Sequence, residues 1–219
     1  MLFLLWYFIH RDRYEPEPPK NIIRIYLLGA LMVIPAALIK YIFQPVFNST
    51  PSMIINAFIM SFFLIAPTEK LLKFFVVRIW IYNKIEFDEV MDGIVYRVAS
   101  SLGFATVENI IYVFDKGAGI GILRPFLSVP GYAFFSALMG YYIVQTKFNK
   151  PAEPTLIILG LFWAVFVHGL YDFLLLTKTI RALLVIILII ILGIFTRRNL
   201  KKAELQSKMR IQPHWQKQL

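Results

Sequence analysis

The sequence contains no cysteine in 219 residues, and it has few charged residues for its length. The missing cysteines exclude disulfide bridges, thiolate metal sites and cysteine nucleophiles. Only 16% of the residues are charged and 58% are hydrophobic, whereas about a quarter are charged in a typical soluble domain. There is also no internal repeat and no soluble domain. These proportions predict a polytopic membrane protein rather than a soluble one.

Long apolar runs supply the predicted membrane spans, because about 20 apolar residues are needed to cross about 30 Å of hydrocarbon. Six runs qualify, with soft borders: Ile22–Phe47, Met53–Tyr82, Val90–Phe114, Phe126–Thr146, Thr155–Leu176 and Ile180–Phe195. A seventh run, Met1–Ile9, rises only about 14 Å as a helix and is expected to be half a span, an interfacial anchor or a remnant. We therefore predict an all-α transmembrane bundle of six full spans plus a short N-terminal hydrophobic segment, in one domain over residues 1–219.

Basic residues outnumber acidic ones by 23 to 13, and they gather at the ends of the apolar runs. Membrane topology explains this pattern better than nucleic-acid binding does, so the lipid bilayer is the expected partner. The proline-rich linker 10–24, the basic tail 196–219 and the segments around Lys84 and Lys147 fall on one side if the six spans alternate. The positive-inside rule then places linker, tail and C-terminus in the cytoplasm of a multi-pass cell-membrane protein.

Four ionisable residues lie deep in the predicted spans, where such groups need a partner or a water-filled cavity. They are Glu69, Glu108, His168 and Asp172. Glu69 and Lys73 are four residues apart on one helix face, as are His168 and Asp172. Each pair taken singly is explained by helix packing, but together they predict a buried polar cavity. Proton or ion transport and hydrolysis both remain open for such a cavity.

The order of the motifs resembles the PrsW family of intramembrane proteases, relatives of the CAAX-prenyl and bacteriocin-processing proteases. The resemblance rests on APTEKLLKF, FDEVMDGIVYRVASSLGFATVENIIYVF, VPGYAFFSALMGYYI and HGLYDFLL, and on the linker RDRYEPEPPKNIIRIYLLGAL. It covers most of the chain, from about residue 11 to about residue 176. It implies proteolysis of a membrane-anchored protein substrate, as with anti-sigma factors in regulated intramembrane proteolysis.

The resemblance also implies which residues form the site. Catalytic positions fall on Glu69, Glu108 and His168, with Asp172 as a supporting or catalytic group. Other motif positions are occupied by Lys70, Lys73, Asn109 and Tyr132. Two of these depart from the family pattern, because Lys70 stands where a second glutamate is expected and Tyr132 where a histidine is expected. Each departure removes an expected metal ligand or base.

Two versions of hydrolysis follow from this resemblance. In the first, Zn²⁺ bound by Glu108, His168 and Asp172 activates a water molecule, and Glu69 is the general base. In the second, no metal is needed: a glutamate activates water directly, while His168 and Asn109 donate hydrogen bonds to the oxyanion.

Two other functions remain open at the level of sequence. Lys70 and Tyr132 motivate a catalytically inactive family member that binds membrane partners without cutting them. A proton-coupled transporter is the third possibility, which the lack of internal repeats disfavours. Arg97 lies three turns before Glu108, and we expect it to reach the cytoplasmic interface.

Overall fold

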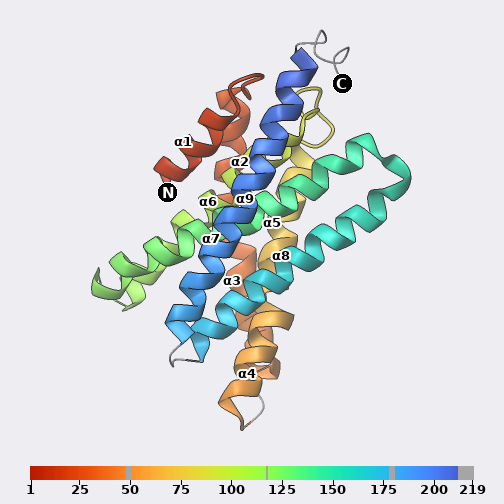
Figure 1. The fold of residues 1–219 in the computed structure, drawn as a ribbon. Coiled ribbons are helices and arrows are strands. Elements are labelled where there is room, and N and C mark those ends of the chain that lie inside the picture. Colours follow the sequence, from red (N-terminus) through yellow and green to blue (C-terminus); the bar gives the residue numbers. More distant parts are fainter. Residues whose placement is uncertain (48–50, 117, 178–180, 212–219) are drawn as a thin grey trace.

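The computed structural model describes residues 1–47, 51–116, 118–177 and 181–211, and this part of the chain is helical without strands (Figure 1). The α-helices are α1 (Leu2–Arg11), α2 (Pro19–Leu31), α3 (Val33–Phe47), α4 (Met53–Ile59), α5 (Ala66–Trp80), α6 (Val90–Lys116), α7 (Ala118–Phe148), α8 (Glu153–Leu176) and α9 (Arg181–Ile211). A π-helical segment, Met60–Ile65, joins α4 to α5, and a 3₁₀ turn, Lys150–Ala152, precedes α8. The predicted all-α fold is confirmed.

The predicted number of six full spans is not confirmed. Four helical stretches in the described residues are long and apolar enough to cross a membrane: Pro19–Phe47, Met53–Trp80, Lys150–Leu176 and Leu183–Met209. The predicted spans Val90–Phe114 and Phe126–Thr146 do lie in helices, α6 and α7, but these two helices do not reach that standard. A long apolar stretch identifies a helix that faces lipid. Helix α6 faces other helices of the protein instead, so its residues need not all be apolar.

Helix α6 is the central helix of the bundle, and every residue from Val90 to Ala105 is buried. It packs most extensively against α7 and α2. Backbones touch at these contacts, since a Cβ atom on Gly103 would lie 1.9 Å from the carbonyl oxygen of Tyr26, and one on Gly140 would lie 2.2 Å from that of Gly93. Small residues that allow such close approach are typical of helix packing in membranes.

The four basic segments named above meet at one end of the bundle, called the basic end below. Arg11 and Arg13 of the linker pair with Glu204 of α9 at 3.2 and 3.1 Å. Lys84 donates to the side chain of Asn21 at 2.9 Å, and Lys150 donates to the hydroxyl of Tyr82 at 3.0 Å. The linker, the tail and both basic loops therefore lie together, on whichever side of the membrane that end faces.

Two segments that the sequence left undefined pack against the bundle as helices. Helix α9 continues through the predicted tail as far as Ile211, with Leu200 and Ala203 buried, and residues 212–219 lie outside the described part. Helix α1 packs against α6 through the buried Phe8, and the Thr106 hydroxyl of α6 donates to the sulfur of Met1 at 2.8 Å.

Candidate functional site

A cavity of about 220 Å³ in the membrane part of the bundle is lined by three of the four deep ionisable residues. Glu69 comes from α5, Glu108 from α6 and Asp172 from α8. The polar lining also includes Lys40 of α3, Tyr112 of α6 and Tyr132 of α7. Its apolar lining includes Ile65, the last residue of the π-helical segment that leads into α5. Five helices thus converge on one polar cavity, which we call the central cavity.

Glu69 is held by two ammonium groups in the central cavity. Its Oε1 accepts a hydrogen bond from the Lys40 ammonium group at 2.6 Å, and its Oε2 accepts one from Lys73 at 2.9 Å. Glu69 is only 1% exposed and the Lys73 side chain is fully buried. The sequence predicted the Lys73 partner from its spacing but missed Lys40, although a lysine inside the apolar run VIPAALIKYIF was a visible signal.

His168 lies between two carboxylates of the cavity. Its Nε2 is 3.2 Å from Oδ2 of Asp172, four residues along α8, and 4.0 Å from Oε2 of Glu69. The imidazole is stacked on the ring of Phe135 with centroids 5.5 Å apart, and its Nδ1 is buried without a hydrogen-bond partner in the described structure. The three predicted residues Glu69, His168 and Asp172 are therefore brought together.

Glu108 and Asn109 are placed differently although they are adjacent in the sequence. The hydroxyl of Tyr132 donates a hydrogen bond to Glu108 Oε2 at the cavity wall. Tyr132 thus occupies the position of the expected histidine with a donor rather than a metal ligand. The side-chain amide of Asn109 donates to the carbonyl oxygen of Ala105 at 2.8 Å in its own helix, and Asn109 does not line the cavity.

Lys70 does not line the central cavity, because it faces α7. Its buried ammonium group lies 4.8 Å from the ring centroid of Phe135 and 5.8 Å from that of Tyr132, and it has no hydrogen-bond partner in the described part. The expectation for Arg97 was wrong. Its guanidinium is fully buried rather than at an interface, and none of its three nitrogens has a hydrogen-bond partner among the described residues.

Arg97 and Lys70 lie at the same depth in the bundle. Gly93 faces Gly140 where α6 and α7 touch. Two turns further along α6, Ser101 donates to the carbonyl oxygen of Tyr132 at 3.2 Å. This antiparallel register sets Arg97 opposite Ser136, next to the Phe135 ring under Lys70. The interior beside the cavity therefore holds two cationic groups that repel each other.

The central cavity does not fit the predicted Zn²⁺ ion as its side chains stand. Catalytic zinc is held by three protein ligands plus water. In the described residues, no three ligand atoms of the cavity's carboxylates and His168 lie within 4.8 Å of one another. Glu69 is already bonded to the ammonium groups of Lys40 and Lys73. A divalent cation would have to displace these two ammonium groups to use Glu69 as a ligand.

A second group of ionisable side chains lies at the basic end, outside the spans. Asp12 and Glu17 come from the linker, Glu89 immediately precedes α6, and Asp92 lies in the first turn of α6. Burial raises the pKa of Asp12 to about 7, and the negative charge of Asp92 adds to this effect. Burial also raises the pKa of Glu89 to about 8, reinforced by a hydrogen bond with Glu15. Sequence reasoning did not single out this group, which we call the acidic cluster.

The fold and the central cavity define a class: polytopic membrane proteins with an ionisable site inside the helix bundle. A family model described as "PrsW family intramembrane metalloprotease" matches residues 17–196. The chain therefore belongs to the PrsW family of intramembrane metalloproteases, which is a family of protease enzymes.

Curated relatives agree with this assignment over most of the chain. Protease PrsW of Geobacillus kaustophilus is 38% identical over 80% of this chain and 76% of its own length. Protease PrsW of Oceanobacillus iheyensis is 36% identical over 92% of this chain and 91% of its own length. Protease PrsW of Bacillus subtilis is 33% identical over 95% of this chain and 94% of its own length. No solved structure matches the chain.

Proposed function

We propose that the protein hydrolyses a peptide bond of a membrane-anchored protein in the central cavity. The observation that carries this proposal is the convergence of Glu69, Glu108 and Asp172 from three helices on one cavity beside His168. Because the cavity lies among helices apolar enough to cross a membrane, the proposed substrate is a single membrane span of another protein.

Glu108 is the carboxylate best suited to activate water, because Glu69 is already held by two ammonium groups. Glu108 accepts a hydrogen bond from Tyr132 and lines the cavity, where its carboxylate can take a proton from water as the oxygen attacks the carbonyl carbon. The same proton then goes to the leaving amine nitrogen when the tetrahedral intermediate breaks down. Atoms and charge balance over the two steps without a metal ion.

Lys40 is the candidate for stabilising the oxyanion. Its ammonium group lines the cavity, and its side chain is 24% exposed, whereas Lys73 is fully buried. A positive charge held in place by Glu69 stabilises developing negative charge without reorganising in the reaction. Asp172 orients His168, whose Nε2 lies 3.2 Å away, and so fixes the position of the imidazole beside the cavity.

The test is cleavage of a single-span reporter in proteoliposomes. We expect the chain to cleave it and Glu108→Gln to reduce the rate by about 10²–10⁴, the usual contribution of a general base. Glu153→Gln, which removes an ion pair with Arg78 at the basic end, is the matched control and should keep its rate. Equal rates for the chain and Glu108→Gln would rule out the assigned role.

A non-cutting family member is the competing outcome, which the positions of Lys70 and Tyr132 motivate. The variant carrying both Lys70→Glu and Tyr132→His tests it in the same assay. Cleavage by this double variant alone would show that the chain binds membrane partners without hydrolysing them. Cleavage by the unaltered chain supports the protease proposal.

The basic end is proposed to face the cytoplasm, because it gathers all four basic segments. Since the chain has no cysteine, Lys201→Cys at the exposed surface of α9 gives a single label site. A membrane-impermeant maleimide should label it only after the cells are opened. Labelling of intact cells would reverse the orientation.

A further inference from the structure

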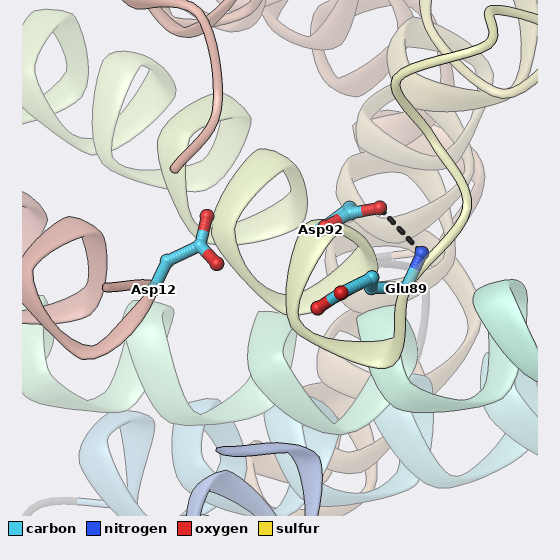
Figure 2. A group of neighbouring side chains, drawn as sticks. All are labelled: Asp12, Glu89 and Asp92. Carbon is cyan, nitrogen blue, oxygen red and sulfur yellow. Dashed lines mark hydrogen bonds between the residues drawn. The ribbon is translucent and has the colours of Figure 1, made fainter. Parts of the chain in front are cut away.

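The acidic cluster gathers buried carboxylates from two segments far apart in the sequence. Figure 2 shows Asp12 from the linker turned toward Glu89 and Asp92 at the beginning of α6. One ligand oxygen from each of the three lies within 4.8 Å of the other two. The three residues are only 2%, 3% and 1% exposed. Carboxylates this close and this buried repel one another when ionised, unless protons or a cation neutralise them.

Among the described residues, no basic side chain neutralises Asp12. Its Oδ2 accepts the backbone N–H of Glu17 at 3.3 Å, while its buried Oδ1 has no hydrogen-bond partner in the described structure. The neighbouring basic residues Arg11 and Arg13 turn away and pair with Glu204. Among the described residues, neither Asp12 nor Asp92 pairs with a basic side chain.

Asp92 is held in position by the backbone rather than by a charge. Its Oδ2 accepts the N–H groups of Asp88 and Glu89 at 2.7 and 2.6 Å, which fixes the carboxylate at the beginning of α6 (Figure 2). Ser207 of α9 donates to Oε2 of Glu89. Backbone N–H groups thus hold Asp92, and a serine hydroxyl holds Glu89, while Glu17 and Glu15 also bond to these two carboxylates.

An open route leads to the cluster. A cavity of about 260 Å³ reaches Asp92 from the basic end, and its other polar lining residues are Glu15, Glu17, Glu86 and Asp88. Every ionisable residue in this lining is a carboxylate. Such a lining concentrates cations from solution and repels anions.

We propose that Asp12, Glu89 and Asp92 bind a hard divalent cation, Mg²⁺ or Ca²⁺, at the basic end. All three side-chain ligands are carboxylates, which suit these ions, whereas the imidazole and thiolate ligands that favour zinc are missing from the cluster. The orphaned Oδ1 of Asp12 gains a partner when the ion binds, and the repulsion among the three carboxylates becomes attraction to the ion.

The bound ion would fasten the linker to the beginning of α6. It would not take part in hydrolysis, because Asp92 and Glu108 are 16 residues apart on α6, or about 24 Å along the helix. The cation site and the central cavity are therefore independent, and either proposal can fail without the other.

The test is Mn²⁺ binding to the purified full chain in detergent, measured by electron paramagnetic resonance after treatment with EDTA. We expect one Mn²⁺ per chain, displaced by Mg²⁺ or Ca²⁺. Asp12→Asn should weaken Mn²⁺ binding by more than about tenfold, because affinity follows the number of charged ligands. Glu86→Gln, an exposed residue of the same acidic cavity, should change it less than about twofold.

Thermal unfolding keeps the test informative if a variant folds poorly. Mg²⁺ at a hundredfold excess over its dissociation constant should raise the melting temperature of the chain by about 5–10 °C. In EDTA, Asp12→Asn should melt no lower than the unaltered chain, since it removes a buried charge. No stoichiometric Mn²⁺, binding unchanged by Asp12→Asn, or binding lost in Glu108→Gln instead would each overturn the proposal.

Discussion

The central cavity and the acidic cluster are two solutions to the same problem of burying carboxylates. In the central cavity the chain provides the partners itself: Lys40 and Lys73 bond to Glu69, and Tyr132 bonds to Glu108. In the acidic cluster Asp12 has no cationic partner among the described residues. Deep in hydrocarbon no ion can be taken from solution at low free energy, whereas the end of the bundle is within reach of water. The depth of a carboxylate in the bundle thus decides whether side chains of the protein or, as proposed, a cation from solution balances its charge.

The largest expected effect comes from breaking the ion pairs of Glu69. Glu69→Gln leaves the buried ammonium of Lys73 without its carboxylate, and removing one partner of a buried pair costs about 3–5 kcal/mol. The melting temperature in detergent should therefore fall by about 6–20 °C for a chain of this size.

Glu153→Gln is the matched control for that experiment. It breaks pairs with Arg78 and Lys150 whose side chains are partly exposed, and the loss should stay below about 1 kcal/mol. Asp12→Asn in EDTA should have the opposite sign from Glu69→Gln. If both lower stability alike, the distinction between the two clusters is wrong.

Lys70→Glu should stabilise the protein by about 1–3 kcal/mol, the usual cost of leaving a buried polar group without a partner, which is the next largest effect. Lys70 and Arg97 are both buried cations without hydrogen-bond partners in the described part, and they lie at the same depth. A glutamate at position 70 would replace their repulsion with an ion pair to the guanidinium. Chemical unfolding of the purified variant measures the gain.

The control for this pairing is Lys70→Met, which removes the charge but cannot bond to Arg97. We expect it to gain less than Lys70→Glu. An equal gain would mean that relief of desolvation alone explains the effect, and that position 70 and Arg97 do not pair.

The smallest expected effect concerns two tyrosines that each donate to a glutamate. Tyr132→Phe removes a donor to Glu108 in the central cavity, and a hydrogen bond to a charged group contributes about 1.5–3 kcal/mol. Tyr96→Phe removes a donor to Glu17 in the acidic cluster. Burial raises the pKa of Glu17 to about 10, so that at pH 7 this bond joins neutral groups and contributes about 1 kcal/mol. An equal loss of stability in the two variants, measured by thermal unfolding, would contradict the proposed difference in charge between Glu108 and Glu17.

The sequence predicted the helical class and the central site because apolar length and i, i+4 spacing are local properties. One turn of a single helix brings together each of the two expected pairs, Glu69 with Lys73 and His168 with Asp172. The six-span count was not confirmed because α6 is surrounded by protein and therefore tolerates polar residues.

The remaining features depend on contacts between distant segments. Lys40 meets Glu69 across 29 positions of sequence, and Asp12 meets Asp92 through the linker, so neither contact has a local signal. Arg97 looked like an interfacial residue because its helix was expected to begin at the membrane surface. The close packing of α6 against α7 and α2 buries it instead.

The direct backbone contacts of α6 at Gly103 and Gly140 have a mechanical consequence. Where helices touch without intervening side chains, no side chain can move aside. A shift or rotation of α6 would therefore cause steric clashes between backbone carbonyl oxygens and the neighbouring helices. Helices α3 and α4 differ, because most of their described side chains are exposed. Entry of a substrate helix into the bundle is therefore expected to displace α3 and α4. Helix α6 is expected to keep its position, and with it the distance between the acidic cluster and the central cavity.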